Sequence, residues 1–172
     1  MNSFKKTLPY WGAIILLIIF DQYTKYLITG TFDFKLGESV PVIDGLFNIT
    51  YVRNPGAAFG FLANAGSAIR KPLFLLVPVL ACIWLVWLLM HSVEKNRLLT
   101  WAYSLIFAGA IGNLIDRFRL DYVVDFLDFY LGNSHFPAFN VADSCISIAA
   151  GMIILDLFLQ MKKKDELNVE QE

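Results

Sequence analysis

The sequence places carboxylic acids inside some of its most apolar stretches. Asp125 and Asp128 lie within VVDFLDF (residues 123–129), and Asp143 lies two residues before Cys145, at the start of another apolar run. Burial penalises an ionised carboxylate, so two acids that share a site cannot both ionise cheaply and one keeps its proton. One acid can then activate a water as general base while the other acts as general acid toward an amide. This chemistry needs no metal.

A structural explanation is strong for Asp143 and weaker for Asp125. Asn140 is a good helix N-cap, and an acid at position 143 suits the first turn of the helix that follows. Asp125 has apolar neighbours on both sides and no such capping role. Asp121 and Asp128 lie nearer to expected solvent and are interpreted as ordinary interface charges. The local sequence alone therefore leaves both explanations open.

Other catalytic groups are scarce. The chain has two histidines, no H-E-x-x-H or C-x-x-C pattern for zinc, and no G-x-S-x-G pattern for a serine nucleophile. Cys145 and His135 could be a thiol nucleophile and its base, but nothing nearby would favour the thiolate. A buried, inert cysteine is the better interpretation, and we expect no metal site and no cofactor.

Composition is typical of a membrane protein. Of the 172 residues, 57% are hydrophobic and 17% charged, whereas a soluble domain carries about 25% charged residues. A hydrocarbon core of about 30 Å needs about 20 apolar residues in a helix. The sequence therefore predicts an α-helical integral membrane protein, a single domain of residues 1–172. Its four predicted spans are residues 8–28, 72–90, 98–117 and 141–161.

Four spans place both termini and the loop 91–97 on one side of the membrane. These segments hold half of the fourteen basic residues, so the positive-inside tendency predicts that they are cytoplasmic. The basic start and apolar run resemble a signal peptide, but no small-residue cleavage site follows, so we expect an uncleaved first helix. Residues 162–172 are predicted to be a solvated, charged cytoplasmic tail. The net charge of −1 gives no reason to expect a nucleic-acid partner.

Two regions are predicted to face the outer side. Residues 31–66 alternate apolar and polar side chains and contain a hairpin-turn signal at Asp44-Gly45, which predicts a small β-hairpin. Within this region, AAFGFL (57–62) is interpreted as a short interfacial helix. The second region, residues 118–140, contains the acidic stretch and receives no predicted element.

Ionisable groups inside spans are functional candidates. Asp21 and Lys25 are spaced i, i+4 and can form an ion pair, which is either structural or part of a site. Asn113 and Arg117 share that spacing and present an amide and a guanidinium on one face, beside Asp116. Arg117 alone would be explained as a helix-end anchor, but next to Asn113 and the acids a site is the better interpretation.

Two further features of the spans indicate structure rather than chemistry. Ala108 and Gly112 are small residues spaced i, i+4, and they permit close helix packing. Asp156 lies near the cytoplasmic end of the fourth span, where water can reach it, and is interpreted as structural.

Five motifs in order resemble those of bacterial lipoprotein signal peptidase, or signal peptidase II. They are DQYTK (21–25), RNPGAAFGF (53–61), GAIGNLIDR (109–117), VVDFLDF (123–129) and FNVADS (139–144). The resemblance covers nearly the whole chain, and five motifs in this order on a four-span chain are specific. It implies a membrane-embedded aspartic peptidase that needs no metal and cleaves a prolipoprotein's signal peptide just before a diacylglyceryl-modified cysteine. It also implies inhibition by the cyclic peptide globomycin.

The resemblance also implies roles for individual residues. Asp125 and Asp143 would be the catalytic dyad. The substrate site would be lined by Asn54, Asn113, Arg117 and Asn140. Supporting residues would be Asp21, Lys25, Gly56 and Asp116. The implied partners are lipid-modified prolipoproteins and membrane lipids, and the implied location is the bacterial inner membrane with the active site near the outer leaflet.

Protonation within the dyad can be predicted from the two environments. The helix dipole favours an anion at Asp143, whereas desolvation disfavours the charge of Asp125. We therefore expect Asp143 to be ionised and Asp125 protonated, an order that Arg117 would reverse if it lay closer to Asp125.

Two other functions fit some of these observations. A small transporter or proton-relay protein would also hold intramembrane carboxylates, but distributed through the bilayer or paired across inverted repeats. Here the acids cluster at one face and no repeat is visible. A non-enzymatic assembly factor would use the polar residues only to fix helix packing.

Overall fold

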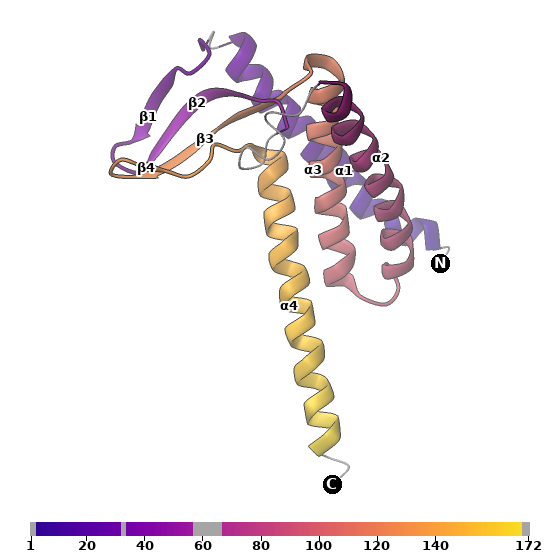
Figure 1. Ribbon diagram of the computed structural model, residues 1–172. Helices are drawn as coiled ribbons and strands as arrows, with labels where there is room; N and C mark the ends of the chain where they lie inside the picture. The colour runs from indigo at the N-terminus through magenta and orange to yellow at the C-terminus, as the bar shows by residue number, and fades with distance from the viewer. Residues whose placement is uncertain (1–2, 32–33, 57–66, 170–172) are drawn as a thin grey trace.

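Four long helices and a small sheet at one end of them make up the computed structural model, which describes residues 3–31, 34–56 and 67–169 (Figure 1). The helices are α1 (Ser3–Tyr26), α2 (Ser67–Ser92), α3 (Arg97–Leu120) and α4 (Val141–Val169). A π-helical turn, η1 (Leu27–Thr31), continues α1. All four helices are long and apolar enough to cross a membrane, so the predicted fold class is confirmed.

The helices extend beyond the predicted spans, most of all at the C-terminus. Helix α4 continues to Val169 and includes most of the segment predicted to be a solvated tail. In Figure 1 this part of α4 projects well past the other helices. Its Lys, Glu and Leu residues are good helix formers, so the helix does not end where the apolar sequence ends. The predicted interfacial helix at 57–62 lies outside the described residues.

Helix α3 is the centre of the bundle. It contacts α1, α2 and α4, and its apolar stretch is more deeply buried than those of the other three helices. Small residues allow this close approach. A β-carbon on Gly109 would collide with the backbone carbonyl of Ala142 in α4, and one on Gly112 would lie 2.6 Å from Asp21 Oδ2 in α1.

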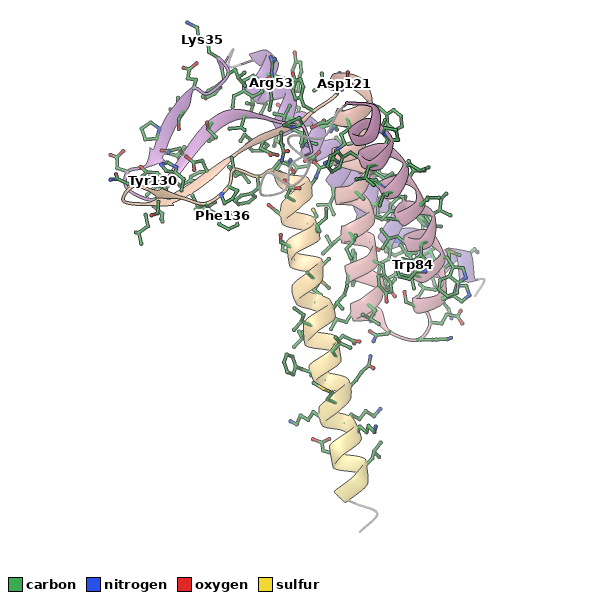
Figure 2. All side chains as sticks on the ribbon, in the orientation of Figure 1. Lys35, Arg53, Trp84, Asp121, Tyr130 and Phe136 are labelled. Atoms are coloured by element: carbon green, nitrogen blue, oxygen red, sulfur yellow. The ribbon has the colours of Figure 1, made fainter. Side chains whose placement is uncertain are left out.

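The outer surfaces of the helices are apolar. Leu16 on α1, Trp84 on α2 (Figure 2) and Phe158 on α4 are 68%, 61% and 61% exposed. In water such surfaces would be costly, whereas lipid tails are as apolar as these side chains. The exposed apolar surface therefore agrees with a bundle surrounded by lipid.

The sheet is antiparallel, with strand order β1-β2-β3-β4. Its strands are β1 (Ser39–Ile43), β2 (Phe47–Asn54), β3 (Val123–Leu131) and β4 (Ser134–His135). The predicted hairpin is β1–β2, and Gly45 in its turn has a φ of +79°, which favours glycine. Strands β3 and β4 lie outside the predicted β-rich region 31–66. The first four residues of β3 are all buried, so its sequence lacks the alternation that marks a half-buried strand.

Strand β3 separates a hydrophobic core from the polar site. Val124 and Phe126 pack with Ile28 and Tyr51 in a buried cluster. Successive side chains of a strand point to opposite faces, so Asp125 points away from this cluster. The sheet thus directs one acid toward the helix ends.

Two acids depart from their predicted environments. Asp128 was interpreted as an interface charge, but it is only 7% exposed, and its carboxylate accepts from Asn48 at 2.9 Å and contacts His135 at 2.8 Å. The strand pairing buries it. Asp121, which was interpreted in the same way, is exposed as expected and is the C-cap of α3, with a φ of 66°. Asp156 was expected where water can reach it, but it is buried, and its carboxylate accepts from Asn96 at 2.7 Å, a contact that suits a structural role.

The close packing at α3 predicts that adding one methyl group at position 109 lowers the stability of the protein. Gly109→Ala should lower the free energy of unfolding by about 1–3 kcal/mol, because the backbone of α4 must shift to admit the new atom. Gly151→Ala on α4 is the matched control, since no atom lies within 4 Å of its added β-carbon. Thermal unfolding in detergent measures both, and equal melting temperatures for the two variants would contradict the prediction.

Candidate active site

Asp125 is held by two asparagine side chains. Its Oδ1 accepts from Asn140 Nδ2 at 2.7 Å, and its Oδ2 accepts from Asn54 Nδ2 at 3.0 Å. The residue is 2% exposed. Burial raises the pKa of Asp125 from its ordinary 3.8 to about 6, the negative charge of Asp143 adds to the rise, and the two amides oppose it. Asp125 is therefore poised to carry a proton at mildly acidic pH.

Asp143 lies in the first turn of α4 and is part of its cap. Its backbone N–H donates to Asn140 Oδ1 at 2.9 Å, and its Oδ2 accepts from the Asn140 backbone N–H at 3.3 Å. Its other oxygen, Oδ1, accepts from Asn113 Nδ2 at 2.7 Å. The capping explanation is thus correct for one oxygen, while the second is oriented by α3.

The two acids are linked through two amides. Asn140 Nδ2 donates not only to Asp125 but also to Asn113 Oδ1, at 3.2 Å. Asn113 in turn donates to Asp143, so a continuous chain of polar groups runs between the carboxylates. The lysine ammonium of Lys25 donates to Asn113 Oδ1 at 3.0 Å. Because an ammonium only donates, this contact orients the Asn113 amide so that its N–H faces Asp143.

Lys25 is the centre of the supporting network. It is 3% exposed, and its Nζ lies 2.8 Å from Asp21 Oδ2 and 3.0 Å from Asp116 Oδ2. The predicted Asp21–Lys25 pair is therefore confirmed. With Asn113, these acceptors satisfy all three ammonium donors.

Each supporting acid also holds a backbone group of the site. Asp21 Oδ1 accepts from the N–H of Ala142 at 2.9 Å, and Asp116 Oδ2 accepts from that of Val124 at 3.1 Å. These residues precede Asp143 and Asp125 directly in the chain. The buried charges thus fix the backbone next to both candidate catalytic acids.

Gln22 belongs to this network, although no role was predicted for it. Its Nε2 donates to Asp116 Oδ1 at 3.0 Å and to the carbonyl of Gly112 at 3.1 Å. The available signal was its place inside DQYTK, next to Asp21 at the polar end of an apolar span.

Gly56 supports the site through its backbone. Its N–H donates to Asn54 Oδ1 at 2.9 Å. Because this contact occupies the oxygen of the Asn54 amide, the Nδ2 group is directed at Asp125. The φ of Gly56, +105°, favours glycine, and a β-carbon there would lie 2.6 Å from the ring of Phe74. Glycine is therefore strongly favoured at this position.

Arg117 lies beside the network. Its Nη1 donates to the backbone carbonyl of Asn113 at 3.3 Å, and its guanidinium carbon lies 5.9 Å from the centre of the Phe74 ring. Its Nε is buried without a hydrogen-bond partner among the described residues. The structure therefore places Arg117 near the acids with donor capacity to spare.

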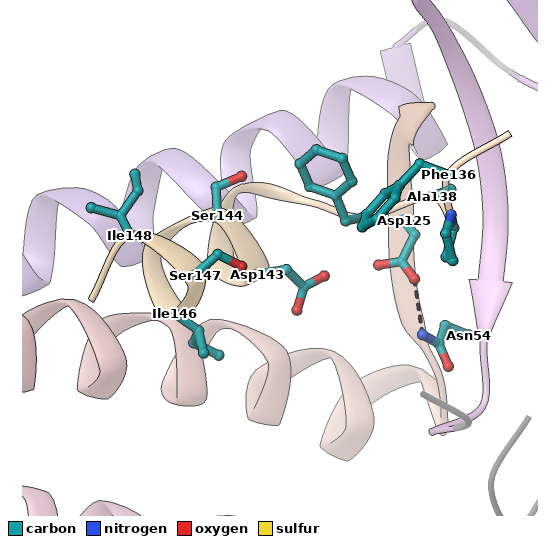
Figure 3. A pocket seen from close by; sticks show the side chains of 11 residues that line it. Asn54, Asp125, Phe136, Ala138, Asp143, Ser144, Ile146, Ser147 and Ile148 are labelled. Carbon is teal, nitrogen blue, oxygen red and sulfur yellow. Dashed lines mark hydrogen bonds between the residues drawn. The ribbon is translucent and has the colours of Figure 1, made fainter. Parts of the chain in front are cut away.

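Both acids line one cavity of about 730 Å³. Figure 3 shows the carboxylates of Asp125 and Asp143 at this cavity, with the hydrogen bond from Asn54. Much of the remaining wall is apolar and comes from the segment before α4 and from its first turns. It includes Phe136, Pro137, Phe139, Ile146 and Ile148. Two acids beside an apolar wall suit acid–base chemistry on a substrate with an apolar part.

Comparison with known proteins identifies the family. The family model described as signal peptidase (SPase) II matches residues 13–159. The chain belongs to the signal peptidase II family. It is accordingly an aspartic peptidase of the membrane-spanning, lipoprotein-processing kind.

Individual relatives support the same family assignment. The lipoprotein signal peptidase of Shewanella piezotolerans is 50% identical over 162 residues, covering 92% of each chain. That of Desulforapulum autotrophicum is 47% identical over 152 residues, covering 88% of this chain and 91% of its own. A solved structure of a bacterial membrane enzyme has a TM-score of 0.77 at 38% identity and covers 91% of each chain.

The Lys25 network predicts a severe loss of stability when its cation is removed. Lys25→Met in this signal peptidase II leaves Asp21 and Asp116 buried without their counter-charge, and this should cost about 3–5 kcal/mol of unfolding free energy. Adding Asp116→Asn to that variant should recover part of the loss, because one unpaired charge disappears. Chemical unfolding in detergent measures both, and a Lys25→Met protein as stable as wild type would contradict this account of the network.

The environment of Asp125 predicts a pH-dependent stability. A pKa raised by folding means that the stability contributed by protonated Asp125 is complete below about pH 4 and is lost as the pH rises through about 6. Asp125→Asn stays neutral, so it should gain stability relative to wild type at pH 8, by at most about 3 kcal/mol, and little at pH 4. Melting temperatures of both proteins across this range test it. Parallel curves would show that Asp125 does not titrate as described.

Proposed function

We propose that this enzyme removes the signal peptide of diacylglyceryl-modified prolipoproteins, cleaving before the lipidated cysteine with Asp125 and Asp143 as its catalytic dyad. The observation that carries the proposal is that these two acids, from a strand and from a helix N-terminus, line one cavity with an apolar wall. Membership in the signal peptidase II family supports the substrate class. The apolar wall suits the lipid chains that anchor such a substrate.

In the proposed reaction the two acids exchange protons with water and the amide. Ionised Asp143 takes a proton from water, and the water oxygen attacks the carbonyl carbon of the scissile bond. Protonated Asp125 gives its proton to the carbonyl oxygen, which yields a tetrahedral diol. As the diol collapses, the carbon–nitrogen bond breaks and the nitrogen leaves as an amine with a proton from the dyad. The raised pKa of Asp125 supports its role as the initial proton donor.

The asparagines and Arg117 are proposed to bind the substrate and to position the acids. Asn54 and Asn140 donate to Asp125, and Asn113 donates to Asp143, so each carboxylate keeps a fixed orientation. The unpaired Nε of Arg117 is a donor for a substrate carbonyl. Asp21, Lys25, Gly56 and Asp116 are proposed as supporting residues, because each orients one of these groups or the adjacent backbone. We propose no role for a metal or cofactor.

The proposed location is the bacterial inner membrane, with both termini in the cytoplasm. In Figure 1 the C-terminus, the N-terminal start of α1 and the α2–α3 turn all lie toward the end opposite the sheet. Basic residues are frequent there, as expected for a cytoplasmic side. In this proposed orientation we expect the cavity to lie near the outer leaflet. A lipid-anchored substrate would present its cleavage site at that depth, and we expect globomycin to inhibit by occupying the cavity.

The position of the acids favours hydrolysis over transport. Four acids gather at the sheet end of the bundle: Asp21, Asp116 and Asp125, which are buried, and Asp143, which is partly buried. A proton path would need ionisable groups through the bilayer depth, and Asp156, toward the other end, is engaged by Asn96. A dyad at one boundary fits a reaction there.

If the two acids act as a dyad, the enzyme should lose its peptidase activity when either one is replaced. Asp125→Asn and Asp143→Asn should each lower cleavage of a diacylglyceryl-modified prolipoprotein at least about 10³-fold, and the double variant should be little worse than either single one. The appearance of the shortened product from purified enzyme in detergent measures this loss. Near-wild-type activity in either single variant would remove that residue from the dyad.

The matched control is Asp128→Asn. Asp128 is a buried acid on the same strand, three residues from Asp125, but it binds Asn48 and His135 rather than the site. This variant should keep most of its activity. If Asp128→Asn were as inactive as Asp125→Asn, the losses would reflect damage to the sheet rather than catalysis.

A further inference from the structure

A second cavity, of about 420 Å³, lies at the end of the bundle opposite the sheet. It forms where the start of α1 meets the α2–α3 turn and the first residues of α3, toward the end of the bundle away from the sheet in Figure 1. Its lining includes Lys5, Lys6, Tyr10, Val93, Arg97 and Trp101. The proposed peptidase reaction does not use this cavity, which we call the basic pocket.

The basic pocket keeps an excess of positive charge. Three of its lining residues are cations, and Lys6 pairs with Glu94 at 2.9 Å. That contact lowers the pKa of the Glu94 carboxyl, so Glu94 is ionised at neutral pH and neutralises Lys6. Lys5 and Arg97 are exposed and have no ion-pair partner among the described residues. Two cations are therefore available to an anion.

The N-terminus of α3 adds to this positive potential. Arg97 is the first residue of the helix, and Asn96 caps it by accepting from Leu99 N–H at 3.1 Å. The backbone N–H groups of the first turn have no partner within a helix, and the helix dipole favours an anion at this end. The helix terminus and the two side-chain cations thus act on the same space.

The other side of the pocket is aromatic and apolar. The Tyr10 ring is buried, with its centre 4.7 Å from that of Trp101, which is 36% exposed. Tyrosine and tryptophan are enriched at the boundary between lipid tails and water, where their polar tips meet headgroups. On the same segment of α1, Leu8 is 63% exposed. The pocket therefore joins a cationic region to an apolar surface that continues along the helix.

We propose that the basic pocket binds the phosphodiester headgroup of an anionic phospholipid on the side of the membrane that holds the termini. Basic pockets between transmembrane helices attract such headgroups, and the cavity is within the range of about 300–1,000 Å³ typical of small-molecule sites. Phosphate oxygens bind Lys5 and Arg97, while the acyl chains lie along the outer side of α1. This inference is independent of the proposed cleavage reaction.

Native mass spectrometry of the full chain, released from micelles, tests the proposal. Wild type should retain phosphatidylglycerol in preference to the zwitterionic phosphatidylcholine, and millimolar inorganic phosphate should not displace it. The double variant Lys5→Gln/Arg97→Gln should bind phosphatidylglycerol about 30-fold more weakly, as expected for two basic contacts. The charge-preserving variant Lys5→Arg/Arg97→Lys should retain it, which separates loss of charge from loss of fold.

The control variant is Lys162→Gln/Lys163→Gln. It removes the same charge from exposed positions of α4, outside the pocket, and should bind phosphatidylglycerol like wild type. If this variant lost as much affinity for phosphatidylglycerol as Lys5→Gln/Arg97→Gln does, the binding would reflect general electrostatic attraction to the protein surface. If inorganic phosphate displaced phosphatidylglycerol, the pocket would be a site for free anions. If wild type retained phosphatidylcholine as well as phosphatidylglycerol, the headgroup charge would not matter for binding. Each of these three results overturns the proposal.

Discussion

A single buried ammonium group organises the polar half of this protein. Lys25 joins Asp21 on its own helix to Asp116 and Asn113 on α3. A buried cation is costly unless its partners are well placed, and two acids and an amide meet that requirement here. Because the acids reach onward to the backbone before each candidate catalytic residue, an arrangement that stabilises this charge also positions the site.

Contacts of this kind also fix the orientation of the asparagine side chains. A donor-only ammonium fixes which end of Asn113 faces Asp143, and the glycine N–H at position 56 does the same for Asn54 and Asp125. Each candidate catalytic carboxylate therefore accepts hydrogen bonds from N–H groups whose orientation is fixed. The acids are held on a helix terminus and a central strand, which are more precise supports than loops.

Close packing around α3 is what brings these groups within reach. Glycines at 109 and 112 let α4 and α1 approach the central helix at the level of Ala142 and Asp21. Larger residues would separate the helices and lengthen every contact of the network. The two cavities then differ in charge: Asp125 and Asp143 line the one near the sheet, while Lys5, Lys6 and Arg97 line the one at the opposite end.

The sequence by itself determined the features that depend on neighbours along the chain. Four apolar stretches predicted the four helices, and Asp44-Gly45 predicted the β1–β2 hairpin. The i, i+4 spacing predicted the Asp21–Lys25 pair, and Asn140 was correctly identified as a helix cap. The ordered motifs indicated the family, and with it the two candidate catalytic acids.

Only the tertiary structure decided how distant segments meet. The sheet register brings Asn54 to Asp125 across 71 positions, and helix packing brings Asn113 to Asp143 across 30. Tertiary packing also buries the first four residues of β3, buries Asp128 and places Gln22 in the network. No local pattern marks these contacts, because periodicity reports which side of an element is apolar but not which partner covers it. Which donor meets each acid is set by strand register and helix spacing, and these depend on the packing of the whole chain.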